Sequence, residues 1–324
     1  MLDCIVIGAG QAGLAVGYYL RKKGLDFVIL DAEPGPGAAW RHTWPSLTLF
    51  SNSASSNLPG WPMPHHEGFP PASHVIDYFA RYEKRYELPI RRPVTVDEVT
   101  HDGACFHVFA GKEQLTARTV VAATGTWSAP FIPYYPGTFD GRQWHSAFYP
   151  GPADFAGSTV AVVGAANSGA QIAADLLLSG VETTWYTRSS PRWMPDDVDG
   201  RVLFQRNRAR LNAMLRGEPD PGADTNLGDI VMVPPVLRAR DSGLLQATPM
   251  FSSLDEVNTD HLIWCTGFRP ALQPIRGLLD GTSPTVDGLF LVGYGTWTGP
   301  GSATITGVSP FAKQTAHDVA NICD

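Results

Sequence analysis

The sequence of 324 residues predicts an α/β fold, in which largely parallel sheets alternate with helices. Three observations predict it. Short apolar runs typical of buried strands lead into glycine-rich turns and then into helical stretches. This strand–turn–helix–strand order occurs twice, 156 residues apart. Each copy is followed downstream by an apolar strand that ends in Thr-Gly. The repetition predicts two similar domains, each built on its own parallel sheet.

The first unit contains the pattern G-x-G-x-x-G between a strand at residues 3–7 and a helix at Leu14–Lys23. The first glycine permits a tight turn, the second lets backbone approach a pyrophosphate, and the third lets helix and strand pack closely. The helix N-terminus offers free N–H groups and the positive end of its dipole to the phosphates. The pattern consists of Gly8, Ala9, Gly10, Gln11, Ala12 and Gly13.

A second strand, Phe27–Leu30, completes this unit and is followed at once by Asp31. This carboxylate stands 18 residues after the last glycine of the pattern, where it can accept hydrogen bonds from a ribose diol. Strand, helix and acid together predict a Rossmann-like dinucleotide site.

The second unit has the same order, with a strand at Thr159–Val163, a helix that ends at Leu178 and a strand at Thr183–Tyr186. Its glycine pattern has alanine in place of the second glycine, so the backbone approaches a pyrophosphate slightly less closely. The pattern consists of Gly164, Ala165, Ala166, Asn167, Ser168 and Gly169. A second dinucleotide site is therefore predicted.

The 156-residue offset places Thr187 where the first unit has Asp31, and Arg188 comes next. A carboxylate repels an adenosine 2′-phosphate, whereas a guanidinium pairs with it. Arg188 and the Ser189 hydroxyl therefore predict a pocket that prefers NADPH, with NADH as a weaker alternative. The competing interpretation of Arg188 is a surface arginine at the end of a strand.

The two Thr-Gly strands also resemble each other. Residues 120–125 end in Thr124-Gly125, and residues 262–267 end in Thr266-Gly267. A strand that ends in this way is typical of chains with two dinucleotide sites, where it closes each domain and connects it to the other. We therefore place all four residues at the cofactors.

Composition excludes several other classes of protein. The chain is 44% hydrophobic and only 17% charged, which excludes a disordered chain despite 33 glycines and 27 prolines. The net charge of −7 argues against a nucleic-acid partner. No apolar run reaches the roughly 18 residues of a membrane span. The sequence also begins without the basic segment of a signal peptide, so a cytoplasmic location is expected.

The cysteines and histidines do not predict a metal site. The cysteines Cys4, Cys105, Cys265 and Cys323 lie far apart and form no C-x-x-C pair. Neither a zinc cluster nor a redox dithiol is therefore indicated, and most of these thiols are expected to be reduced and buried. The adjacent His65 and His66 lie in a proline-rich stretch without a third ligand. We expect no metal.

The segment between the two units is the most specific feature. Residues 139–149 fit the pattern F-x-G-x-x-x-H-x-x-x-Y at every fixed position, with Phe139, Gly141, His145 and Tyr149. This pattern resembles the identifying motif of the flavin-containing monooxygenases. The resemblance extends over nearly the whole chain and is greatest to the short bacterial members. Supporting stretches are residues 47–51, 59–64, 196–201, 228–235 and 293–299.

The resemblance implies a glutathione/thioredoxin reductase-like arrangement. A split FAD domain comprises residues 1–153 and 262–324, and an NAD(P) domain is inserted as 154–261. The implied cofactors are FAD and NADPH. In such proteins NADPH reduces FAD, and O₂ adds to give a C(4a)-hydroperoxide that oxygenates small lipophilic sulfides, amines or ketones. The alternatives are an uncoupled NADPH oxidase or reductase and a catalytically silent redox sensor. A homodimer is left open.

The resemblance also assigns individual residues. Trp40 and Arg41 follow a turn where the family's chain wraps the FAD, and Gly295 belongs to the C-terminal FAD motif. Thr296 stands where the family usually has an aspartate beside the ribityl chain. Asn52 lies where larger members place an asparagine near the hydroperoxide, although a turn residue is an equal alternative. His145 is implied to coordinate reduction with oxygenation, and its alternative is a structural linker histidine.

Overall fold

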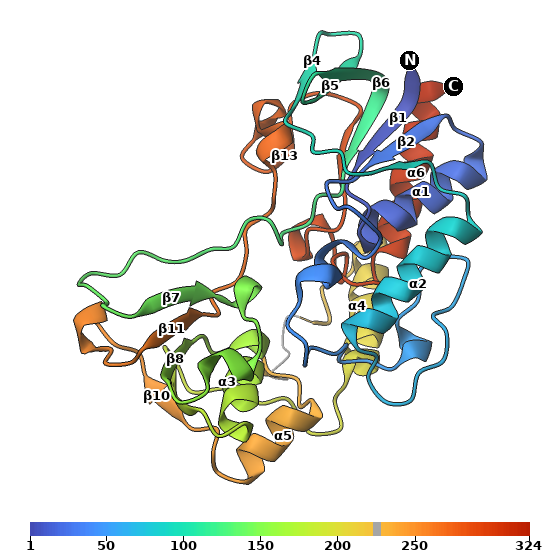
Figure 1. The fold of residues 1–324 in the computed structure, drawn as a ribbon. Coiled ribbons are helices and arrows are strands. Elements are labelled where there is room, and N and C mark those ends of the chain that lie inside the picture. Colours follow the sequence, from blue (N-terminus) through green and yellow to red (C-terminus); the bar gives the residue numbers. More distant parts are fainter. Residues whose placement is uncertain (223–227) are drawn as a thin grey trace.

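Two sheets in two lobes form the framework of the computed structural model, which describes residues 1–222 and 228–324 (Figure 1). The first lobe holds a seven-stranded sheet in the order β3-β2-β1-β6-β5-β4, with β14 also paired to β6. Strands β3, β2, β1, β6 and β14 are parallel, whereas β4, β5 and β6 are antiparallel. The strands are β1 (Leu2–Ile7), β2 (Phe27–Leu30), β3 (Ile90–Arg91), β4 (Glu98–His101), β5 (Phe106–Ala110), β6 (Glu113–Ala122) and β14 (Leu289–Leu291).

Three helices cover this first sheet: α1 (Gln11–Lys23), α2 (Ala72–Arg85) and α6 (Ser309–Cys323). Helix α1 ends at Gly24, whose φ of 74° is the left-handed conformation that closes many helices. Its last turn carries Arg21, Lys22 and Lys23, which favour the negative end of the helix dipole. One apolar core lies between the sheet and α1, α2 and α6, and a second lies on the opposite face.

The second lobe holds a five-stranded, wholly parallel sheet in the order β10-β9-β8-β11-β7. Helices α3 (Asn167–Leu178) and α5 (Pro234–Asp241) pack on one face. The strands are β7 (Arg142–His145), β8 (Thr159–Val163), β9 (Glu182–Thr187), β10 (Ala247–Pro249) and β11 (His261–Trp264). A small antiparallel pair, β12 (Leu279–Asp280) with β13 (Ser283–Pro284), lies beside the first lobe.

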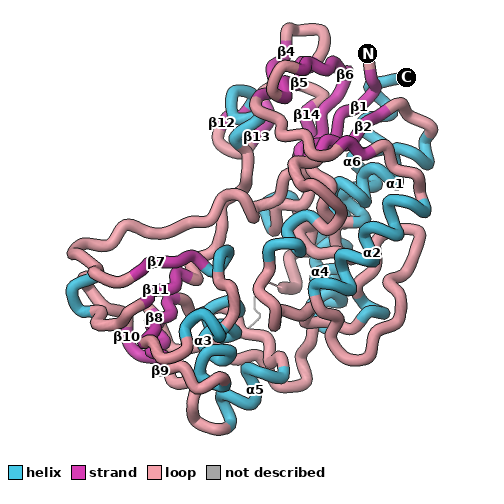
Figure 2. The backbone as a smooth tube through the Cα atoms, viewed as in Figure 1, coloured by secondary structure: helices cyan, strands magenta, loops and turns pink. Residues whose placement is uncertain are grey.

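Strand pairing locates two of the places where the chain crosses between the lobes, and Figure 2 shows the loops that make these crossings. Strand β6 ends in the first sheet at Ala122, and β7 is already part of the second. Strand β11 ends in the second sheet at Trp264. The sheets thus divide the chain near residues 125 and 266, whereas the sequence placed domain boundaries at 153/154 and 261/262. Those boundaries stay a prediction, because the sheets alone do not define independently folding units.

Helix α4 (Gly200–Leu215) belongs to the sequence of the inserted unit but lies against the first lobe (Figure 1). The Gly200 N–H donates to the Phe50 carbonyl at 2.7 Å. The rings of Phe50 and Phe204 lie 6.3 Å apart. A side chain at Gly200 would collide with Ser51, so the close approach depends on glycine. Helix α4 thus ties the inserted unit to the first lobe.

The internal repeat produces the same backbone contacts in both lobes. A Cβ at Gly13 would lie 1.9 Å from the Gly8 carbonyl oxygen, and one at Gly169 would lie 2.0 Å from that of Gly164. The third glycine of each pattern is therefore required because its helix touches the preceding turn. The α/β fold with two Rossmann-like units is confirmed.

We predict that Gly169→Ala destabilises the protein by about 1–3 kcal/mol, since the added methyl group forces backbone apart. The measurement is the urea midpoint of unfolding. Gly277→Ala is the control, because no atom of the described ranges lies within 4 Å of a Cβ at that position. Equal midpoints for the two variants would show that the helix–turn contact is not tight.

Candidate functional site

The N-termini of α1 and α3 are free to bind an anion. The residues at the N-cap positions, Gly10 and Ala166, have no polar side chain, and neither helix has a side-chain cap. Helix α4 differs, because the Asp199 carboxylate accepts from two of its N–H groups. The first N–H groups of α1 and α3 have no partner within their helices, and both helices begin at a glycine-pattern turn.

The space above the first fingerprint suits a dinucleotide. A Cβ at Gly10 would meet only the Ala38 side chain, at 3.5 Å, among the described residues. A Cβ at Gly8 would strike the Ala123 carbonyl at 2.5 Å. One glycine thus packs against protein, whereas the other faces room that a pyrophosphate can fill. The residues present fit the cofactor that the pattern predicts.

Asp31 lies at the end of β2 and is only 5% exposed. One of its oxygens accepts from the backbone N–H of Ala9, at 3.4 Å, which places the carboxylate beside the phosphate-binding turn. The other accepts from Arg92 Nε at 2.6 Å. The outer nitrogens of Arg92 donate to Glu83 of α2, each at 2.7 Å.

This buried triad of charges fixes the orientation of the predicted ribose acceptor. Burial raises the pKa of Glu83, and its bonds to Arg92 oppose that rise. Glu83 and Arg92 are not among the site residues predicted from the sequence. No local pattern indicates them, because Arg92 stands 61 residues from Asp31 in the chain.

The C-terminal motif packs directly on the first fingerprint. A Cβ at Gly293 would lie 2.6 Å from the Ala12 side chain. The Gln11 amide donates to the Ala303 carbonyl at 3.0 Å. Gly295, with φ of 92°, faces open space, and Thr296 is exposed at the start of a short 3₁₀ helix. The structure thus brings together the two segments predicted to hold FAD.

The predicted 2′-phosphate pocket lies at the end of β9. Thr187 is buried, whereas Arg188 and Ser189 are exposed. Arg188 Nη2 lies 3.3 Å from the Tyr135 hydroxyl, which leaves other guanidinium N–H groups for a ligand. In the fingerprint before it, the Asn167 side chain accepts from the Val231 N–H at 2.9 Å and secures the start of α3.

The two Thr-Gly pairs form a reciprocal clasp between the crossing segments, which we define as residues 124–131 and 266–271. The Thr124 hydroxyl donates to the Ala271 carbonyl at 2.7 Å, and the Thr266 hydroxyl donates to the Phe131 carbonyl. Backbone bonds from Ala271 to Gly125 and from Phe131 to Gly267 run alongside. Each threonine thus fastens one crossing segment to the other.

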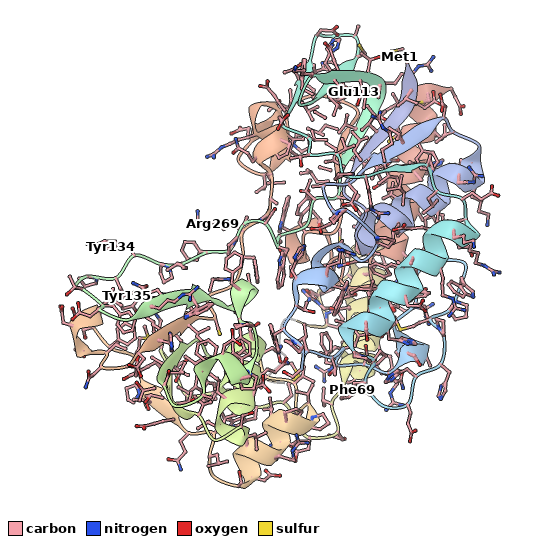
Figure 3. The ribbon with its side chains drawn as sticks, in the orientation of Figure 1. Met1, Phe69, Glu113, Tyr134, Tyr135 and Arg269 are labelled. Carbon is pink, nitrogen blue, oxygen red and sulfur yellow. The ribbon has the colours of Figure 1, made fainter. Side chains whose placement is uncertain are left out.

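The clasp also has an aromatic and a cationic part. The Arg269 guanidinium lies 4.3 Å from the centre of the Phe131 ring, and Figure 3 places Arg269 where the two lobes meet. Among the described residues, no atom would lie within 4 Å of a Cβ at Gly125 or Gly267. Both glycines therefore leave open space beside the clasp.

His145 is buried at the end of β7 and holds one crossing segment. Its Nδ1 accepts from the Ala147 N–H at 3.1 Å, so the proton lies on Nε2, which is 2.9 Å from the Gly267 carbonyl oxygen. Burial lowers the pKa of His145, which keeps the ring neutral. These bonds support the interpretation of His145 as a structural histidine of the linker. A direct part in catalysis stays a prediction.

An apolar cavity of about 210 Å³ lies where both units meet. Trp127 and Phe268, which follow the two Thr-Gly pairs, are stacked there at 5.1 Å. A second cavity of about 260 Å³ shares Trp44, Thr48 and Gln171 with it. The first cavity is lined by Trp40, Trp44, Leu47, Thr48, Leu49, Phe50, Trp127, Ser146, Asn167, Ser168, Gln171 and Phe268.

The residues predicted to lie beside the flavin differ in their positions and contacts. Trp40 lines the cavity. Arg41 instead donates to the Pro36 carbonyl at 3.1 Å and faces Glu33, so it supports the turn. Asn52 caps a 3₁₀ helix, and its side-chain oxygen accepts from the Ser55 N–H at 3.0 Å. This is the turn alternative for Asn52, and its catalytic role stays a prediction.

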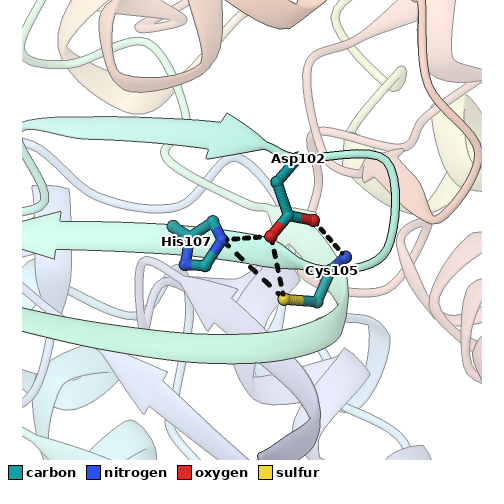
Figure 4. A group of neighbouring side chains, drawn as sticks. All are labelled: Asp102, Cys105 and His107. Atoms are coloured by element: carbon teal, nitrogen blue, oxygen red, sulfur yellow. Dashed lines mark hydrogen bonds and ion pairs between the residues drawn. The ribbon is translucent and has the colours of Figure 1, made fainter.

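Trp127, Gln171 and Phe268 line the cavity but are not among the site residues predicted from the sequence. The aromatic residues that closely follow each Thr-Gly pair were a usable signal, because a strand end that closes a domain places its next residues over the cofactors. Asp102, Cys105 and His107 form a group of possible metal ligands that was likewise not predicted from the sequence (Figure 4). His65 and His66 belong to no such group within the described ranges.

The comparisons with known proteins agree with this geometry. The family model of the pyridine nucleotide-disulphide oxidoreductases matches residues 5–289. A flavin-containing monooxygenase from Stenotrophomonas maltophilia is 44% identical, with a TM-score of 0.87 over 100% of this chain and 99% of that chain. An uncharacterized oxidoreductase of Bacillus subtilis is 31% identical over 97% of both chains.

A more distant relative is an indole-3-pyruvate monooxygenase of rice, Oryza sativa subsp. japonica. It is 30% identical over 62% of this chain and 51% of that protein. The chain therefore belongs to the pyridine nucleotide-disulphide oxidoreductase family and, within it, to the flavin-containing monooxygenases that its linker motif indicated. Among the described helices, none is both long and apolar enough to span a membrane.

We predict that His145 makes stability depend on pH. Its folded-state pKa is lowered by burial, so the unfolded chain takes up a proton first as pH falls below about 6.5. The stabilisation is complete above that pH and is lost as pH falls further. In urea titrations between pH 7.5 and pH 5, the free energy of unfolding should therefore fall less steeply with falling pH in His145→Gln than in the wild type.

The control is His317→Gln on the exposed face of α6, which should keep the wild-type pH dependence. Parallel curves for wild type and His145→Gln would contradict a buried neutral imidazole.

Proposed function

We propose that the protein is a monooxygenase that uses NADPH to reduce FAD and then inserts one oxygen atom of O₂ into small lipophilic sulfides, amines or ketones. The observation that carries this proposal is the aromatic cavity, which takes its lining from both dinucleotide units. Trp40 and Phe50 come from the chain after the first fingerprint, and Asn167 and Ser168 come from the second. The 44% identical monooxygenase supports it.

In this proposal each cofactor has its own set of binding residues. The turn at Gly8–Gly13 and the start of α1 would bind the FAD pyrophosphate, with Asp31 at the ribose and residues 293–296 along the flavin side. The second fingerprint, with Arg188 and Ser189, would bind NADPH. Flavin, when bound, supplies the capacity to accept two electrons from the nicotinamide and pass them to O₂.

The protein's own part is to position the reactants and exclude water. Seven of the twelve residues that line the cavity are aromatic or aliphatic, and the polar ones are Thr48, Ser146, Asn167, Ser168 and Gln171. Such a site binds a lipophilic molecule and keeps bulk water away from reactive oxygen species. His145 supports the wall indirectly, because its ring packs on the edge of Phe268 at 4.9 Å. A cytoplasmic location and a homodimer stay predictions.

We predict substrate-dependent incorporation of one ¹⁸O atom from ¹⁸O₂ into a sulfide, an amine or a cyclic ketone, measured by mass spectrometry with NADPH as reductant. NADPH consumption that yields only H₂O₂ with all three substrate classes would overturn the proposal in favour of an oxidase.

Phe268→Ala should increase the fraction of NADPH that ends as H₂O₂, because it opens the cavity wall to water. Phe148→Ala is the matched control, because Phe148 is 64% exposed and lines no described cavity.

The coenzyme preference has a separate test. Arg188→Gln should raise the KM for NADPH about 10- to 150-fold and leave the KM for NADH nearly unchanged. The loss of one hydrogen bond to a charged group costs about 1.5–3 kcal/mol. Arg276→Gln, an exposed arginine of the first lobe, is the control. Equal effects on both coenzymes would show that Arg188 does not bind the 2′-phosphate.

A further inference from the structure

The turn between β4 and β5 carries three side chains of different chemistry that converge on one point (Figure 4). Cys105 directly precedes β5, and His107 lies two positions later, so the extended chain directs both side chains to the same face. Asp102 reaches them from the other side of the turn. The Cys105 sulfur lies 3.8 Å from His107 Nε2 and 3.9 Å from Asp102 Oδ2. His107 Nε2 lies 2.8 Å from Asp102 Oδ2.

These separations are close to those of a tetrahedral zinc site. With Zn–S of about 2.3 Å and Zn–N and Zn–O of about 2.0 Å, the sulfur lies about 3.5 Å from each other ligand, and nitrogen and oxygen lie about 3.3 Å apart. The group thus needs to move by only a few tenths of an ångström to place a cation where a proton now joins His107 and Asp102.

Two of the three side chains are held in place by other bonds. The second oxygen of Asp102 accepts from the N–H groups of Ala104 and Cys105, at 2.8 and 2.9 Å, which leaves Oδ2 directed at the group. The Gln114 Nε2 amide on β6 donates to His107 Nδ1 at 2.8 Å, so the imidazole proton lies on Nε2 and faces Asp102 Oδ2. Ligation through Nε2 requires the Gln114 amide to turn, so that its oxygen accepts from Nδ1–H.

We propose that Asp102, Cys105 and His107 bind one Zn²⁺ ion, with water as the fourth ligand. A thiolate and an imidazole select a borderline-soft cation over Mg²⁺ or Ca²⁺. Thiolate and carboxylate together neutralise the charge of the ion. An entry path exists, because the side chains of Asp102 and His107 are 49% and 23% exposed.

The site is separate from the proposed oxygenation chemistry. The β4–β5 turn lies at the far end of the first lobe from the second sheet (Figure 1). Bound zinc would fasten this turn, where β4 and β5 form the antiparallel end of the sheet. The zinc proposal therefore does not depend on the proposed function.

The test is calorimetric titration of the reduced, chelator-treated flavoprotein with ZnCl₂. One site is expected, with about one proton released per ion at pH 7 as the thiol ionises, measured by comparing buffers of different ionisation enthalpy. Cys105→Ser should abolish the site or weaken binding more than tenfold. Gln114→Leu should weaken binding about 10- to 100-fold, because it removes the partner that orients His107.

Cys323→Ser, which changes the other partly exposed cysteine, is the control and should bind zinc like the wild type. MgCl₂ should give no saturable heat. Flavin absorbance and the unfolding temperature without zinc establish that each variant is folded. Absence of a saturable site in the wild type, or equal zinc affinity in wild type and Cys105→Ser, would overturn the proposal.

Discussion

In each lobe the first glycine of the fingerprint packs against the backbone carbonyl of the residue that directly follows a neighbouring strand. A Cβ at Gly8 would lie 2.5 Å from the Ala123 carbonyl oxygen, and one at Gly164 would lie 2.4 Å from that of Cys265. Both carbonyls immediately precede a Thr-Gly pair. The contact therefore fixes the point at which each chain leaves its sheet, directly beside the turn where a pyrophosphate would bind.

The clasp and the cavity follow from that geometry. Because both Thr-Gly pairs emerge beside a fingerprint, their two crossing segments meet and exchange threonine hydroxyl bonds. The aromatic residues that follow, Trp127 and Phe268, then stack over the space between the two units. His145 adds a fixed bond to the Gly267 carbonyl from the second sheet. The lobes are thus connected by short hydrogen bonds at the place where electrons would pass between the cofactors.

Much of this could be predicted from the sequence because the fingerprints are local. Gly13 and Gly169 are needed for contacts made within five residues, so their spacing alone identifies the turn and the helix. The long-range partners left no such pattern. Arg92 reaches Asp31 from 61 residues away, and helix α4 lies on the first lobe through Phe50 and Gly200. The group of Asp102, Cys105 and His107 contains only one cysteine and no C-x-x-C spacing, so no metal-binding pattern indicates it in the sequence.

Short-range backbone sterics and apolar periodicity encode the two Rossmann-like units and their order, so these features and the arginine after the second unit can be read from the chain alone. Which side chains face the shared cavity depends on the tertiary structure. The tertiary structure also made Asn52 a helix cap and His145 a buried linker with a lowered pKa. Those outcomes depend on which strand ends pack side by side. Such packing is set by contacts between residues far apart in the chain, and these contacts leave no repeating pattern in the sequence.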